Sequence, residues 1–165
     1  MNELKYQSTY YFKCMGIRGY LENLPVVEKF LNIHAKGCSL DFSIALHEAV
    51  SNALCYGKGG NDHAKVQVNL KRKGKRLYAR VISDNDGFDV LSRIQVVNER
   101  QQNDSWDLTE TRGRGLPIMA NLCSHVWFNG VGNEVLLVLD VAKRIKDIDP
   151  IGCVLKSTKQ DRSAV

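Results

Sequence analysis

The chain has 165 residues, of which 44% are hydrophobic and 25% charged, the proportions of a globular domain with its own core. No apolar run approaches the length of a membrane span and the first residues lack the apolar segment of a secretion signal, so we expect a cytoplasmic protein that makes no contact with a membrane. The net charge of +5 suits an acidic partner. No aromatic residues interleave with the main basic run, residues 71–76, so nucleic-acid binding is not expected.

Five cysteines are spread through mostly apolar segments: Cys14, Cys38, Cys55, Cys123 and Cys153. Their number is odd, and no two of them have the spacing of metal ligands. Because cytosolic thiols stay reduced and free cysteines favour the protein interior, we expect buried, reduced side chains.

The chain opens with patterns typical of a strand and then a helix. Aromatic residues crowd residues 5–15, which favours a strand. Residues 20–36 carry apolar side chains at helical spacing. Pro25 falls within that range, and because proline is tolerated in a first turn, we expect the regular part of the helix to start near it.

The second predicted helix carries the most informative pair of side chains. We expect Ser39 or Asp41 to cap it and Gly57 to mark its end. Glu48 and Asn52 lie four residues apart in it, so both side chains project from one side of the helix. A carboxylate that can accept a proton and an amide oxygen that can bind a hard cation then face the same space, as a Mg-nucleotide site requires.

The middle of the chain predicts a hairpin. After a glycine-rich loop at residues 57–62, residues 65–70 and 77–82 alternate between apolar and polar side chains, which is typical of strands. The basic run between them reads as the hairpin tip. An acidic, glycine-containing turn at residues 83–89 follows the second strand.

A long polar segment, residues 90–112, comes next. It shows some helical spacing, and a connection this long is often a lid over a site. Gly113 and Gly115 then open another helix. Two strands follow, around residues 125–128 and 134–141.

The order of these elements predicts the fold. Runs of strands beside runs of helices favour an α+β fold, here a two-layer α/β sandwich with helices on one face of a mostly antiparallel mixed sheet. One domain is expected over residues 1–142. The basic tail, residues 143–165, has little periodicity and no assigned role.

Three local patterns carry chemistry. They are the Glu48-x-x-x-Asn52 pair, the acidic turn at residues 84–88 and the glycine-opened helix at residues 113–116. An amide oxygen suits Mg²⁺, a carboxylate at a strand end can accept a hydrogen bond from the exocyclic amine of adenine, and backbone N–H groups at a helix start favour phosphate.

An arginine would complete such a phosphate site. Arg112 or Arg114 could add a forked contact to a phosphate group. A Gly-x-x-x-x-Gly-Lys-Ser/Thr phosphate loop does not occur in the sequence.

Together the three patterns resemble the GHKL (Bergerat-fold) ATPases, which carry a histidine-kinase-like ATPase domain. Within them the chain resembles the anti-sigma-factor serine/threonine kinases of bacteria. The matching segments are residues 48–53, 84–89 and 113–119, and the resemblance covers residues 21–139. It implies a Bergerat ATP-binding fold with ATP and Mg²⁺ as cofactors.

The resemblance also implies a role for each matched position. Asn52 would hold Mg²⁺ between the ATP phosphates, Glu48 would be the general base for a substrate serine or a water, and Asp84 would receive the adenine amine. Gly113 and Gly115 would let the lid close over the phosphates. The implied ATP-binding residues are Asn52, Asp84, Gly87, Arg112, Gly113, Arg114, Gly115 and Leu116.

The acidic turn departs from the usual Asp-x-Gly-x-Gly form of the family. Read forward from Asp84, Asp86 replaces the first glycine and Phe88 the second. Read backward from the Gly-Phe pair, the turn is one residue short, or Ser83 holds the Asp position. We prefer Asp84 as the adenine contact, with Asp86 as the alternative. Many relatives also have a threonine near the start of the last strand. This chain has none there, so that hydrogen bond to the base is either missing or comes from Asn133.

Two functions fit these features. The first is a Mg-ATP-dependent protein serine/threonine kinase. By resemblance, its substrate would be a serine on a small anti-anti-sigma (STAS-like) partner, and in its other state it would sequester a sigma factor, regulating transcription by partner switching. The second is a degenerate nucleotide-binding or non-catalytic module that sequesters a regulatory partner. The resemblance is also compatible with a homodimer.

Overall fold

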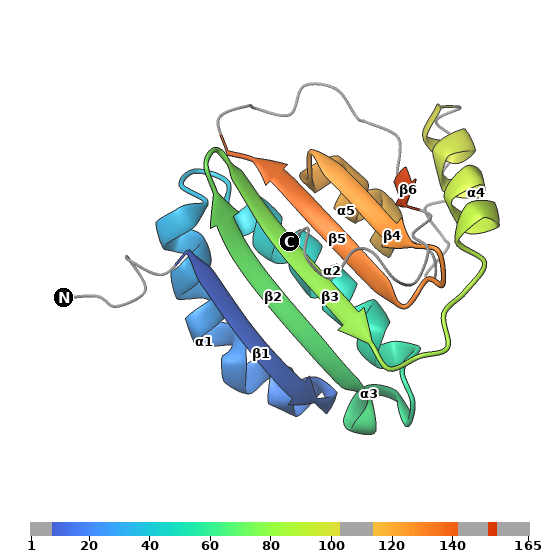
Figure 1. Ribbon diagram of the computed structural model, residues 1–165, viewed down its shortest axis with the longest axis horizontal. Helices are drawn as coiled ribbons and strands as arrows, with labels where there is room; N and C mark the ends of the chain where they lie inside the picture. The colour runs from blue at the N-terminus through green and yellow to red at the C-terminus, as the bar shows by residue number, and fades with distance from the viewer. Residues whose placement is uncertain (1–7, 103–113, 142–151, 155–165) are drawn as a thin grey trace.

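The computed structural model describes residues 8–102, 114–141 and 152–154. In chain order the elements are β1 (Thr9–Met15), α1 (Gly16–His34), α2 (Ser39–Cys55), α3 (Gly60–His63), β2 (Lys65–Lys73), β3 (Arg76–Ser83), α4 (Val90–Gln102), α5 (Gly115–Leu122), β4 (His125–Asn129), β5 (Glu134–Asp140) and β6 (Gly152–Val154). The strands form one sheet in the order β1-β2-β3-β5-β4-β6, and the long helices α1 and α2 cover one face of it (Figure 1).

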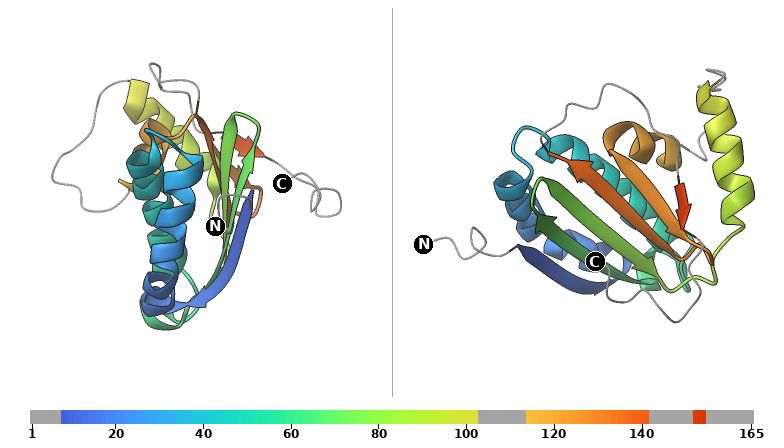
Figure 2. Two further views of the ribbon diagram at one scale, coloured as in Figure 1. Left: turned by 90° about the vertical axis from the view of Figure 1, so that its left-hand side faces the viewer. Right: turned by 45° about the horizontal axis from the view of Figure 1, so that its top comes forward.

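This architecture confirms the predicted two-layer α+β sandwich (Figure 2). Each strand pair is antiparallel except β4 with β6, which is parallel. The predicted hairpin is β2–β3, in which Lys73 pairs with Arg76. The two residues between them form the turn, and Gly74 has a φ of +58° there, as tight hairpin turns of this length require.

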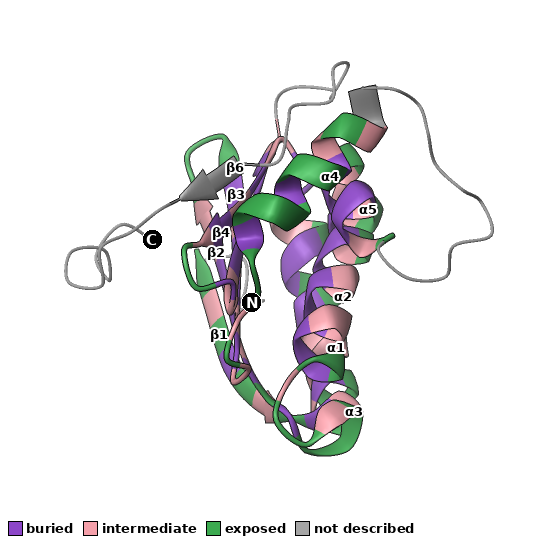
Figure 3. Cartoon of the chain, turned by 90° about the vertical axis from the view of Figure 1, so that its right-hand side faces the viewer, coloured by how far each residue is buried: buried purple, intermediate pink, exposed green. Residues whose placement is uncertain are grey.

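The core lies between the sheet and the helices. Alternate residues of the strands, such as Val68 of β2 and Leu137 of β5, are fully buried against the helical layer. Helix α2 buries Leu46, Val50 and Leu54 in this layer, and Figure 3 shows the purple, buried side of the helices facing the sheet. Burial of this stripe fixes the rotation of α2, and so the direction in which its remaining side chains point.

The start of the first helix differs from the prediction. Helix α1 begins at Gly16, so Pro25 lies in its interior rather than in its first turn. Proline there removes the N–H that would bond the carbonyl of Leu21. Both residues are exposed, so water can reach that carbonyl, and the rest of the helix is anchored by buried residues such as Phe30.

Two further local predictions were wrong. Neither Ser39 nor Asp41 caps α2, because the N-cap is Cys38 and no side chain bonds the helix start there. The loop predicted at residues 57–62 contains most of the short helix α3. The tail, to which the sequence assigned no role, contributes the three-residue strand β6, which pairs with β4.

The cysteines follow the prediction only in part. Cys123 is buried, Cys14 and Cys38 are half-buried and Cys55 is exposed, and all four are free thiols. The side chain of Cys153 lies outside the described part of the chain. None of the described helices has the length and apolar character needed to cross a bilayer.

Candidate functional site

A cavity of about 800 Å³ opens between α2, α4, α5 and the ends of β3 and β5. A volume of this size fits a small-molecule ligand. Its walls come from segments far apart in the sequence, because the sheet places the turn after β3 beside the turn between β4 and β5. The site is therefore a product of the tertiary fold.

One part of the cavity is an apolar slot. Ala53 of α2, Val81 of β3, Met119 of α5 and Phe128 of β4 line it, and all four are buried. Phe88, which is partly exposed, meets Phe128 edge to face with ring centroids 5.5 Å apart. Such walls suit a flat aromatic ring.

Another part is polar, and here two of the three predicted patterns meet. A Cβ on Gly115 would lie 2.7 Å from Nδ2 of Asn52 and 3.3 Å from Oε2 of Glu48. Both side chains are half-buried. Asn52, Gly115 and Leu116 line the cavity itself, and Glu48 stands beside them. The helix pair thus brings a carboxylate, an amide and a helix start together.

The start of α5 adds hydrogen-bond donors to this polar end. The first turn of a helix leaves its N–H groups without intrahelical acceptors, and Ile118 is the first residue of α5 to bond back, to the carbonyl of Arg114. Pro117 has no N–H, so Gly115 and Leu116 supply the donors. N–H groups at a helix N-terminus, together with the helix dipole, favour an anion.

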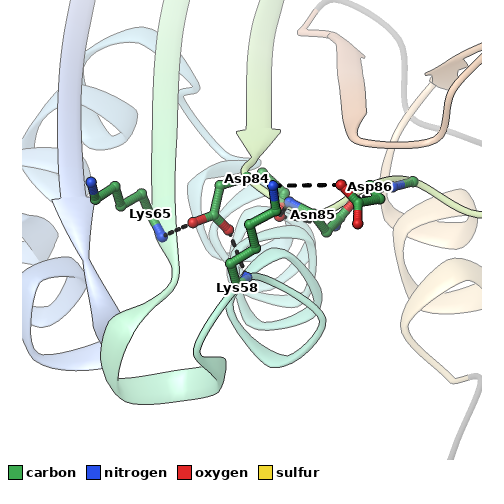
Figure 4. Close-up of polar contacts among 7 residues, drawn as sticks. Lys58, Lys65, Asp84, Asn85 and Asp86 are labelled. Atoms are coloured by element: carbon green, nitrogen blue, oxygen red, sulfur yellow. Dashed lines mark hydrogen bonds and ion pairs between the residues drawn. The ribbon is translucent and has the colours of Figure 1, made fainter.

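Of the three predicted patterns, the acidic turn is the one whose geometry was not foreseen. The Asp84 carboxylate accepts hydrogen bonds from the backbone N–H groups of Lys58, at 2.9 Å, and of Lys65, at 3.0 Å (Figure 4). Asp84 does not line the cavity. Its two bonds tie the loop after α2 to the start of β2, which is a bracing geometry, so an adenine contact by this residue stays a prediction.

The residues around Asp84 do face the cavity. Ser83 is buried and donates its hydroxyl to the carbonyl of Ala53, at 2.9 Å. The hydroxyl oxygen of Ser83 also accepts two hydrogen bonds from Asn85, one from Nδ2 at 2.9 Å and one from the backbone N–H at 3.2 Å. The Oδ1 of Asn85 in turn accepts the N–H of Gly87, at 2.8 Å.

Asp86 lines the cavity but points outward. Its side chain is 93% exposed and lies 3.5 Å from Nζ of Lys58, a surface ion pair worth at most about 1 kcal/mol. Figure 4 shows Asp86 on the opposite side of the turn from the bonds of Asp84.

Two glycines join this turn to the one between β4 and β5. Gly87 has a φ of +92°, and a Cβ there would collide with the carbonyl oxygen of Val131, which accepts the N–H of Phe88 at 3.1 Å. Gly132 has a φ of +87° and packs its α-carbon against the backbone of Phe88. Only residues without a Cβ allow the two turns to approach this closely.

Arg93 is a cavity residue that the sequence did not indicate. Asp89 positions it, since the Asp89 carboxylate caps the start of α4 by accepting the N–H and hydroxyl of Ser92 at 3.2 and 2.8 Å. These bonds lower the pKa of the Asp89 carboxyl. Arg93 is exposed and lines the cavity. The position of Arg93 in the cavity wall depends on how α4 is oriented against the cavity, which the sequence does not show.

The other charged residues that line the cavity already have partners. Asp86 faces Lys58, Glu134 forms an ion pair with Arg80 and Asp89 is held by its helix cap. Within the described ranges no ion pair is seen for Arg93, which is exposed at the cavity wall.

The remaining predicted residues divide into three groups. Gly87 and Leu116 line the cavity. Arg114 is exposed, immediately precedes α5 and does not line the cavity. Arg112 and Gly113 lie outside the described residues.

The donor set fits a magnesium ion that is carried by phosphates. In the described ranges no three His, Cys, Asp or Glu residues cluster as metal ligands. Mg²⁺ that is bound through one protein oxygen, substrate phosphates and water needs no such cluster, and the amide of Asn52 offers that oxygen.

A comparison with protein families matches residues 23–139 to the family described as the histidine kinase-like ATPase domain. The matched range contains every residue of the cavity described above. A comparison with curated proteins finds no match.

Proposed function

This chain belongs to the histidine kinase-like ATPase domain family, and we propose that it is a protein serine/threonine kinase that uses Mg-ATP bound in the cavity between α2, α4 and α5. Its family supports ATP binding. The observation that carries the kinase proposal is the meeting of Glu48, Asn52 and Gly115 at one end of that cavity.

The chemistry of the walls sets the direction of the bound nucleotide. The slot formed by Ala53, Val81 and Phe128 takes the purine ring, because burying apolar surface favours it there. The triphosphate then extends toward Asn52 and the first N–H groups of α5, where anions are stabilised. Arg93 contributes a positive charge from the opposite helix.

Each polar residue has a part in phosphoryl transfer. Asn52 would hold a magnesium ion through its amide oxygen, and an ion held there would offset the negative charge of the phosphates. The serine hydroxyl of the partner attacks the γ-phosphorus, a new O–P bond forms, and the bond to the β,γ-bridging oxygen breaks to release ADP. Glu48 accepts the hydroxyl proton.

The resemblance to anti-sigma-factor kinases suggests the partner. We propose a small anti-anti-sigma (STAS-like) protein as the acceptor, with a sigma factor sequestered in the alternative state. The net charge of +5 is compatible with an acidic protein surface as partner.

Two variants and one binding assay test this function. The parent should unfold at a higher temperature with Mg-ATP than without, because a ligand that binds the native state stabilises it. Asn52→Ala should lose this stabilisation. Glu48→Gln should keep it, yet should lose phosphoryl transfer to a serine-bearing partner. Equal transfer rates for Glu48→Gln and the parent would remove Glu48 from the role of base.

A second candidate is a binding module that has lost turnover. The position of Asp84 supports it, because the carboxylate expected to contact adenine accepts the backbone N–H groups of Lys58 and Lys65 instead. Such a module would bind a regulatory partner tightly with no transfer by the parent, and Mg-ATP would leave its unfolding temperature unchanged.

A further inference from the structure

We propose that Asn85 reads the base in this cavity, and that the site therefore accepts adenine and guanine nucleotides with similar affinity. The inference rests on the proposed nucleotide function and concerns which nucleotide is bound. It follows from which polar side chains beside the apolar slot still have a donor or an acceptor that is not bonded within the protein.

The carboxylates of the turn after β3 are directed away from a base. Each oxygen of Asp84 accepts one backbone N–H group, that of Lys58 or that of Lys65, and Asp84 does not line the cavity. The Asp86 side chain is 93% exposed and faces Nζ of Lys58. A base in the slot therefore meets neither carboxylate.

The other two carboxylates of the cavity wall are also engaged. Glu134 pairs with Arg80, and Asp89 caps α4 through Ser92. Within the described wall both carboxylates are therefore held against neighbouring side chains of the protein.

The buried hydroxyl of Ser83 has no capacity left. A hydroxyl has one donor and two acceptor positions. Ser83 donates to the carbonyl of Ala53 and accepts two bonds from Asn85. All three positions are occupied, so this oxygen cannot bond a base as well.

Among the residues of the turn after β3, Asn85 is the one whose side chain can still bond a base. It is half-buried and lines the cavity. The N–H of Gly87 needs an acceptor and the oxygen of Ser83 receives a donor, so these neighbours fix which end of the amide carries oxygen and which carries nitrogen. One N–H of Nδ2 and one lone pair of Oδ1 stay available.

An amide with both functions does not choose strongly between purines. The six-membered ring of adenine presents an amine and an acceptor nitrogen, and that of guanine presents a carbonyl and an N–H donor. An amide can complement either pair, whereas a carboxylate repels the carbonyl of guanine. Asn133, which also lines the cavity, is neutral too, and its Oδ1 already accepts a bond from Asn129 at 2.6 Å.

Calorimetry with Mg-ATP and Mg-GTP tests the inference on the full chain. The parent should bind the two nucleotides with affinities within about tenfold of each other. Asn85→Asp keeps the acceptor for the N–H of Gly87 and replaces the remaining donor by an acceptor. It should raise the ratio of ATP to GTP affinity by about tenfold or more, chiefly by weakening GTP.

Asp86→Asn tests the competing carboxylate in the same assay. The ratio of ATP to GTP affinity should stay as in the parent, because Asp86 faces Lys58 rather than the base. A parent that prefers ATP more than a hundredfold, with the preference lost in Asp86→Asn, would overturn the inference. An unchanged ratio in a folded Asn85→Asp would do so as well. A parent that binds neither nucleotide would instead overturn the proposed function.

Discussion

Gly115 stands so close to Asn52 that a single added carbon would reach the amide nitrogen, at 2.7 Å. The obstacle is the tip of a flexible side chain, so Gly115→Ala should fold while turning the Asn52 amide away from the cavity. We expect the affinity for Mg-ATP, measured by calorimetry, to fall at least about tenfold. The free energy of unfolding should change by no more than about 1 kcal/mol, since alanine suits a helix better than glycine.

A double-mutant cycle controls this prediction. If Gly115→Ala acts through Asn52, the affinity lost in the double variant with Asn52→Ala should be no larger than that lost with Asn52→Ala alone. Additive losses would mean that Gly115 acts on the phosphates directly through its own backbone.

Arg93 should bind the phosphates and leave the nucleoside untouched. We expect Arg93→Ala to weaken ATP binding about tenfold or more and to leave adenosine binding unchanged, because the charge-assisted contact is made only to the phosphate oxygens. Arg18→Ala is the matched control, since Arg18 is a helical arginine with a 94% exposed side chain that does not line the cavity. Equal losses for ATP and adenosine would place Arg93 against the base.

Asp84 should support stability more than ligand binding. The carboxylate of Asp84 accepts two backbone N–H groups. In Asp84→Asn an amide replaces it, so the NH₂ group of the amide faces one of these two donors and that hydrogen bond is lost. We expect the free energy of unfolding in urea to fall by about 1–3 kcal/mol. A variant of normal stability that has lost ATP binding would restore Asp84 as the adenine contact.

Two glycines of similar backbone geometry should respond differently to alanine. Gly87 and Gly74 both have a positive φ, but a Cβ on Gly87 would collide with the carbonyl of Val131, whereas a Cβ on Gly74 meets nothing within 4 Å. We expect Gly74→Ala to cost about 1 kcal/mol of unfolding free energy and Gly87→Ala at least about 2 kcal/mol. Similar losses would show that the two turns do not need their close approach.

The thiols should differ in reactivity. Burial raises the pKa of Cys123 to about 12, so almost no thiolate forms there at pH 8, while Cys55 is exposed. Alkylation at pH 8 followed by peptide mapping should find Cys55 modified first and Cys123 modified only after denaturant is added. Rapid labelling of native Cys123 would contradict its burial.

The amino-acid sequence was sufficient for the elements whose physics is local. The alternation of apolar and polar residues in β2 and β3, and the apolar spacing in α2, show which face of each element is buried. This pattern can be read directly from the sequence, because it depends only on the order of residue types. The same periodicity put Glu48 and Asn52 on one side of α2. Their meeting with Gly115 followed from matching the order of three patterns to a family.

Only the tertiary structure decided where the irregular residues point. Asp84 is drawn out of the cavity by N–H groups of Lys58 and Lys65, which come 26 and 19 residues earlier in the chain. Arg93 reaches the cavity only because of how α4 lies against it. In a turn the direction of a side chain depends on partners that are distant in sequence, and no local period records them.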